Sequence, residues 1–140
     1  MTTRPEFGSA GGVRLRELIK RYGALGPEAA LAVLGDSLIG LAAALEHGTV
    51  HWDYQPEYVL IDRHGGIELT GFGRPAVTDP RVPARLTPYQ APELRHGAPA
   101  SWASNVYAAT AVFFECLTGQ TPFSGTLGHL AMQQDRKSVV

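Results

Sequence analysis

Asp53 is the side chain in this sequence with the clearest potential for chemistry. It lies in the stretch His51-Trp52-Asp53-Tyr54-Gln55-Pro56-Glu57-Tyr58, between a long apolar segment and a short β-type segment. A carboxylate in such a loop can accept the proton of a substrate hydroxyl. The simpler interpretation of a lone loop aspartate is a turn residue that binds nearby backbone amides.

A zinc site is the other chemistry that this region suggests. His47 and His51 stand four residues apart, which is a metal-binding spacing when both lie on one continuous helix. Gly48 interrupts that helix, and no third ligand follows closely. We therefore predict no zinc site here.

Two helices precede the loop. Leu15, Leu18, Ile19 and Tyr22 recur at helical spacing, which predicts a short amphipathic helix from Val13 to about Gly23. A second helix is predicted from Pro27 to His47, with almost no polar face. Its apolar part is short for a membrane span and holds Asp36 and Ser37 in its middle, so we expect a buried core helix.

The segments after the loop alternate between β-type and helical patterns. Residues 58–61 and 67–70 predict a hairpin around a turn at 62–66. The proline-rich stretch 74–90 predicts a surface segment without regular structure. A second all-round apolar helix is predicted from about Ser101 to Gly119, and a last short helix at 127–134.

Composition limits the classes of function. The chain has 140 residues, of which 44% are hydrophobic, so one domain with its own core is expected. Twelve Lys+Arg against thirteen Asp+Glu exclude a strongly basic or acidic binding surface, so no nucleic-acid or membrane partner is predicted. The single cysteine, Cys116, is expected to be a buried thiol. Residues 1–12 hold no apolar signal segment, and a cytoplasmic location is expected.

The order of these parts resembles one family. The motifs HWDYQPEYVLID, GFG and APEL, followed by SNVYAATAVFFECLTGQTPF, are similar to the C-terminal lobe of a bacterial serine/threonine protein kinase of the actinobacterial type. The resemblance covers about Val13 to Phe123. It implies a mainly α fold with a small β-hairpin, as a C-lobe fragment. Residues 1–12 would be a flexible lead-in or hinge remnant, and 13–140 a C-lobe truncated before its last helices.

The resemblance also implies roles for the site residues. Asp53 takes the position of the catalytic base, and Gln55 replaces the lysine that contacts the transferred phosphate. Tyr58 and Gly71 replace the asparagine and aspartate that bind magnesium, so no metal ligand is expected. Leu60 corresponds to the apolar floor beneath adenine. We expect no cofactor, with ATP bound without magnesium as the alternative.

Further positions of the family concern regulation and packing. Trp52 replaces an arginine that pairs with a phosphorylated activation segment, so Thr78 and Thr87 are expected to be solvated loop residues. Asn105 stands where an aspartate binds the backbone of the catalytic loop. Glu93 is expected to lack its usual arginine partner. The apolar framework is expected to persist, in His51, Phe72, Val112 and Cys116.

Three functions agree with this pattern. The leading hypothesis is a pseudokinase-like scaffold that binds a protein partner, or itself, through the segment 74–90 and an exposed lobe interface. The partner could be an N-terminal lobe supplied by another chain. The alternatives are part of a serine/threonine kinase that binds ATP and phosphorylates hydroxyls through Asp53, and a truncated copy without function.

Overall fold

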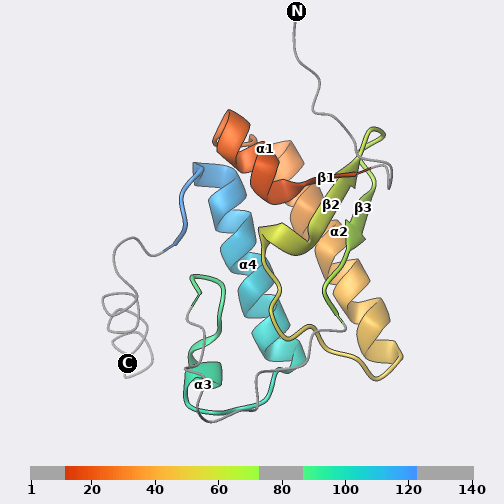
Figure 1. Cartoon of the computed structure of the whole chain (residues 1–140), viewed down its shortest axis with the longest axis vertical. Coiled ribbons are helices and arrows are strands. Elements are labelled where there is room, and N and C mark those ends of the chain that lie inside the picture. Colours follow the sequence, from red (N-terminus) through yellow and green to blue (C-terminus); the bar gives the residue numbers. More distant parts are fainter. Residues whose placement is uncertain (1–11, 73–86, 123–140) are drawn as a thin grey trace, which may run out of the picture.

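Two long helices and a small sheet form the framework of the chain (Figure 1). The computed structural model describes residues 12–72 and 87–122. The described elements, in chain order, are β1 (Gly12–Arg14), α1 (Leu15–Tyr22), α2 (Pro27–Glu46), the 3-10 helix η1 (Pro56–Tyr58), β2 (Val59–Asp62), β3 (Ile67–Leu69), α3 (Pro92–Arg95) and α4 (Trp102–Thr118). This mainly helical architecture confirms the predicted fold class.

The sheet has three antiparallel strands in the order β1, β2, β3, rather than the predicted two. The hairpin of β2 and β3 was predicted, but Val13 and Arg14 belong to β1 and not to the first helix. Gly12 allows this pairing to be close, because a Cβ atom there would lie 3.0 Å from Cβ of Leu60. The predicted boundary between residues 12 and 13 therefore falls inside a strand.

The two long helices begin and end at the residues that the sequence suggested. Pro27 occupies the first turn of α2, and Gly48 follows its end with a φ of 78°. A capping box between Ser101 and Ser104 starts α4. Gly119 ends it in the left-handed conformation. These residues set where α2 and α4 begin and end, and the two helices pack side by side (Figure 1).

The prediction that both long helices are buried all round is wrong. Each buries one face, and α2 contributes Ala30, Val33, Ser37 and Leu41 to the interior. On its other side Ile39 is 69% exposed, and Phe114 of α4 is 43% exposed. The reason is that α2 and α4 pack against each other, and α2 against β3, along one face only.

Helix α2 is long and apolar enough to cross a membrane by length and composition, with 22% of its apolar window buried inside the protein. A polar contact lies near its middle. The hydroxyl of Tyr54 donates a hydrogen bond to Oγ of Ser37 at 2.6 Å, and both side chains are buried. This contact fastens the loop after α2 back onto the helix.

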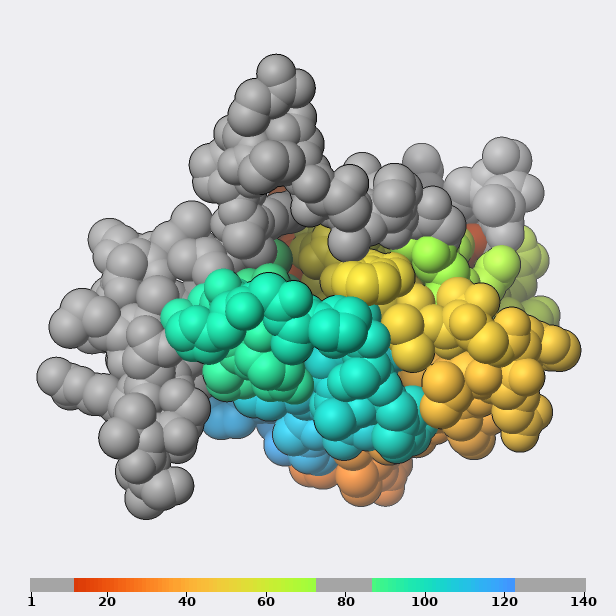
Figure 2. Space-filling model, turned by 90° about the horizontal axis from the view of Figure 1, so that it is seen from below, coloured from red at the N-terminus to blue at the C-terminus, as the bar shows by residue number. Residues whose placement is uncertain are grey.

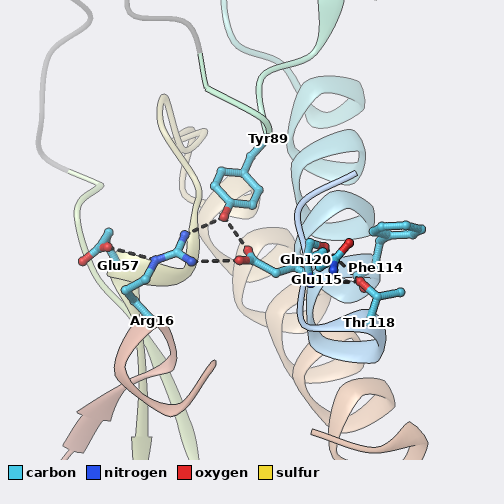
Figure 3. A network of polar contacts seen from close by, with 7 residues as sticks. All are labelled: Arg16, Glu57, Tyr89, Phe114, Glu115, Thr118 and Gln120. Carbon is cyan, nitrogen blue, oxygen red and sulfur yellow. Dashed lines mark hydrogen bonds and ion pairs between the residues drawn. The ribbon is translucent and has the colours of Figure 1, made fainter. Parts of the chain in front are cut away.

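A partly buried polar network joins four segments that are far apart in sequence (Figure 3). Arg16 of α1 donates hydrogen bonds to Glu57 of η1 at 3.1 Å and to Glu115 of α4 at 2.8 Å. It also donates to the hydroxyl of Tyr89 at 2.5 Å, and that hydroxyl donates to Glu115. One guanidinium thus connects the first helix, the loop after Asp53, the segment before α3, and α4.

Electrostatics keep this network charged. Burial opposes the positive charge of Arg16, but its hydrogen bond with Tyr89 and its pairing with Glu115 outweigh that cost, so its pKa is raised. Burial, together with the hydrogen bond to Glu115, raises the pKa of the Tyr89 phenol. Arg16 is therefore protonated and Tyr89 neutral at neutral pH.

Replacing Arg16 by Met should lower the free energy of unfolding by about 3 kcal/mol, because the carboxylate of Glu115, 4% exposed, would lose its partner. Urea denaturation followed by circular dichroism measures this loss. The exposed neighbour Arg14 supplies the matched control, and Arg14→Met should change the stability little. Equal losses in the two variants would contradict a structural role for the network.

Candidate functional site

The loop from His51 to Tyr58 is anchored to the core through α4. Asn105 accepts a hydrogen bond from the backbone N–H of His51 at 3.1 Å and donates one to its carbonyl oxygen at 2.7 Å. Both bonds are buried. The contact between Asn105 and the loop backbone is the one predicted from the sequence. Because an amide both accepts and donates, Asn105 satisfies both backbone groups of His51.

The ring of His51 is held by both of its nitrogens. Nδ1 accepts a hydrogen bond from the backbone N–H of Asp53 at 3.0 Å, so the proton lies on Nε2, which donates to the carbonyl of Thr70 at 2.7 Å. Burial lowers the pKa of His51, in agreement with a neutral ring. The ring of Phe72 lies beside it, with centroids 4.7 Å apart. The predicted stack of His51 and Phe72 is present.

Asp53 lies at a small cavity between the loop, the segment before α3, and α4. The cavity has a volume of about 30 Å³, and Asp53, Thr87, Ser104 and Asn105 are among its lining residues. Figure 2 shows the loop (yellow) at the surface between the start of α4 and the end of α2. A volume of this size is enough for about one ordered water beside Asp53.

The expectation that Thr87 is a solvated loop residue is wrong. Thr87 is 9% exposed, and its hydroxyl accepts a hydrogen bond from the backbone N–H of Tyr89 at 3.3 Å. Tyr89 is buried as well, because it belongs to the Arg16 network. The predicted surface segment 74–90 therefore turns inward at its end. Thr78 lies outside the described residues.

Gln55 is buried without a hydrogen-bond partner for its side-chain nitrogen. The residue is 5% exposed, and Nε2 meets no acceptor in the described part of the chain. It does not line the cavity that contains Asp53. A neutral amide can be buried here at a smaller cost than the charge of a lysine.

Tyr58 and Gly71 face each other. Gly71 has a φ of 85°, and a Cβ atom placed on it would lie only 2.7 Å from Cδ1 of Tyr58. The aromatic ring therefore fills the space into which a side chain at position 71 would extend. Across residues 12–72 and 87–122, no group of three His, Cys, Asp or Glu side chains is arranged to hold a metal ion.

Leu60 lies on the face of the sheet that points away from the core. Its neighbours on β2 are Val59, which is fully buried, and Ile61, which packs against the core cluster. Leu60 is half-buried and pairs with Arg14 and Glu68 on the adjacent strands. This placement leaves an apolar side chain on the outer face, and its role beneath an adenine stays a prediction.

The predicted packing positions of α4 are in the core. Val112 and Cys116 are completely buried in the same cluster as Val59. Burial, with a contribution from Glu115, raises the pKa of Cys116 to about 12, so this thiol is unreactive. Glu93, by contrast, is exposed, and its carboxylate forms no ion pair within the described residues.

The Arg16 network was missed by the sequence analysis. Arg16 and Glu115 are separated by 99 positions, so no local pattern pairs them. One signal was available, because Glu115 is a lone carboxylate in an otherwise apolar helix. A charge in that position is buried only with a partner, which points to a cation elsewhere in the chain.

The stability of the chain should fall as the pH is lowered from about 7 to 5. Burial lowers the pKa of His51 below 6.5, so in this range the unfolded state binds more protons than the folded state. Urea denaturation at several pH values measures the slope, which His51→Gln should reduce. His47 is exposed, and His47→Gln is the control with an unchanged slope. Parallel curves for wild type and His51→Gln would contradict the assignment of a neutral, buried imidazole.

Known proteins resemble this chain over most of its length. It is 40% identical over 132 residues to the serine/threonine-protein kinase PkaB of Streptomyces coelicolor, which covers 84% of this chain and 31% of PkaB. It is 38% identical over 120 residues to PknL of Mycobacterium tuberculosis, covering 81% and 30% of the two chains. The corresponding identity with PrkC of Bacillus subtilis is 34% over 120 residues, covering 81% and 18%.

These comparisons agree with the geometry of the loop, the hairpin and α4. The chain spans less than a third of the length of these relatives. The family described as the protein kinase domain matches residues 6–140. This chain belongs to the protein kinase family and carries a fragment of a serine/threonine kinase domain.

Proposed function

We propose that this chain is a pseudokinase-like module that binds a protein partner and does not carry out efficient magnesium-dependent phosphoryl transfer. The observation that supports this most strongly is the contact between Tyr58 and Gly71. Magnesium in phosphoryl transfer needs oxygen ligands at nearly ideal octahedral positions. Glycine supplies no side-chain oxygen, tyrosine offers a phenol in place of an amide or carboxylate, and the ring occupies the space that a side chain at position 71 would need.

The size of the expected loss distinguishes an impaired enzyme from an inactive one. Removal of one preorganised electrostatic group costs about 10²-fold in rate at the low end. Two such losses would slow a kinase that turns over at ~10 s⁻¹ to ~10⁻³ s⁻¹. The neutral, buried Gln55 adds to this loss, because the positive charge of the family's lysine is absent as well.

The exposed apolar side chains support a binding role. Trp102, Phe114 and Leu117 of α4 are each more than a third exposed, and no charged residue of α4 other than the buried Glu115 accompanies them. Large apolar groups that gather on one helix mark an interaction surface. The partner is a protein, either a second copy of this chain or another kinase-family segment, and we expect the module to act in the cytoplasm.

The alternative function is a serine/threonine kinase that acts through Asp53. The observation that favours it is the preserved loop geometry, because His51 and Asn105 hold the backbone of Asp53 as a catalytic loop requires. In that case ATP would lie on the outer face of the sheet over Leu60, and Asp53 would accept the proton of the substrate hydroxyl.

A phosphotransfer assay separates these two functions. The purified chain, with radiolabelled ATP, magnesium and a mixture of basic and acidic protein substrates, should transfer no more phosphate than Asp53→Asn. The kinase domain of PkaB serves as the positive control in the same mixture. Transfer by the wild type that disappears in Asp53→Asn would overturn the proposal and establish the kinase.

Association is the second part of the proposal. Sedimentation velocity of the chain over a range of concentrations should show reversible self-association that Leu117→Asp reduces, because a charge on the apolar face opposes its burial. Thr49→Asp adds the same charge at an exposed turn outside α4 and should have no effect. A monomer at every concentration, or equal effects of the two variants, would contradict a binding surface on α4 in a second copy.

A further inference from the structure

Three consecutive residues after β3 are held by the loop that contains Asp53. The backbone carbonyl of Tyr58 accepts a hydrogen bond from the N–H of Thr70 at 2.8 Å and one from its hydroxyl at 3.3 Å. The carbonyl of Thr70 accepts a third bond, from Nε2 of His51. Phe72 packs against the ring of His51. Gly71, between these two residues, is contacted by the ring of Tyr58.

The contact at Gly71 has a specific geometry. A Cβ atom on Gly71 would lie 2.7, 2.8 and 3.1 Å from Cδ1, Cγ and Cε1 of Tyr58. Three neighbouring ring atoms at nearly equal distances mean that the glycine approaches the face of the ring and not its edge. The hydrogen of Gly71 in the Cβ direction therefore points at the aromatic face.

Glycine is required at position 71 for two independent reasons. Its φ of 85° lies in the region that side chains of L-residues rarely adopt. The space above it is taken by the ring of Tyr58. A side chain here would therefore strain the backbone and also displace the ring. Tyr58 and Gly71 behave as one packing unit, and neither can be changed without a consequence for the other.

The ring of Tyr58 also reaches His51. Their centroids are 5.6 Å apart, and His51 in turn lies 4.7 Å from Phe72. Both residues that hold the segment 70–72 are thus in contact with each other. The described contacts that fix this segment are backbone hydrogen bonds and ring packing, and none of them involves an ion pair.

We propose that Tyr58 is a positioning residue, an aromatic lock that fixes Thr70, Gly71 and Phe72 on the loop by packing its ring on Gly71. The lock makes the position of this segment independent of any cation. This proposal does not depend on whether the chain binds a partner or transfers phosphate, because it concerns only contacts within the chain. The backbone carbonyl of Tyr58 binds Thr70, and its ring contacts Gly71, which that carbonyl does not reach.

The first test needs no substitution. In the NMR spectrum of the full chain, one α-hydrogen of Gly71 should be shifted strongly upfield of the other by the ring current of Tyr58, with a nuclear Overhauser contact to the ring. Addition of magnesium or of a chelator should leave both signals unchanged. Two α-hydrogens at ordinary glycine positions would overturn the proposal.

The second test separates positioning from general stability. Hydrogen exchange of the Thr70 amide, which donates to the carbonyl of Tyr58, is compared with that of α4 in Tyr58→Ala, Tyr58→Phe and Val33→Ala. Tyr58→Ala should speed exchange at Thr70 by about tenfold more than in α4, because local opening of this segment no longer breaks the ring contact. Tyr58→Phe keeps the ring and should exchange like the wild type.

Val33→Ala is the matched control. Val33 is buried in α2, so its truncation lowers global stability without touching residues 70–72, and it should speed exchange in both regions alike. The same uniform pattern in Tyr58→Ala would show that Tyr58 is an ordinary core residue and would contradict the lock. If Tyr58→Ala does not fold, the ring-current measurement on the wild type still decides the question.

Discussion

The pair of hydrogen bonds between Asn105 and the backbone of His51 is the interaction on which the rest of the site depends. It joins α4, the most buried helix, to the first residue of the loop. From His51, one ring nitrogen orients the amide of Asp53 and the other holds the carbonyl of Thr70. The positions of the loop and of the segment after β3 thus depend on the buried amide side chain of Asn105, acting through His51.

This arrangement explains how the loop around His51 and Asp53 keeps its shape without ion pairs among these contacts. The contacts that shape the loop are neutral hydrogen bonds and aromatic packing, which need neither phosphate nor metal. The positions to which the sequence resemblance assigned a charge or a metal ligand hold the buried amide of Gln55, the ring of Tyr58 and Gly71. Fold and chemistry depend on different residues, so one can persist where the other has been replaced.

Charge in this protein serves the fold instead. Arg16 links α1, η1 and α4, and its raised pKa keeps it ionised. The carboxylate of Glu115 is acceptable inside an apolar helix only because Arg16 and Tyr89 reach it. Glu57 of the Arg16 network and Tyr58 of the aromatic lock are consecutive residues of the chain.

The sequence predicted what depends on local patterns. Apolar periodicity and the residues Pro27, Gly48 and Gly119 located the two long helices, and the turn at 62–66 located the hairpin, because each signal acts on its own neighbours. The strand β1 was missed because three residues carry too little pattern. Three features were not predicted: the burial of Thr87, the Arg16 network, and the contact of Tyr58 with Gly71. Each arises between segments that are separated in sequence, and a local pattern of residue types does not tell which separated segments meet in space.

The measurement that tests the central claim most directly is a titration of the isotopically labelled chain with paramagnetic Mn²⁺, a substitute for magnesium, in the presence and absence of ATP. Bound Mn²⁺ broadens the NMR signals of residues near it. The account predicts no saturable broadening at Asp53, Tyr58 or Gly71, because the ring of Tyr58 occupies the space of a side chain at position 71 and glycine offers no carboxylate there. Saturable broadening centred on these residues would contradict it and would restore a metal-dependent kinase site.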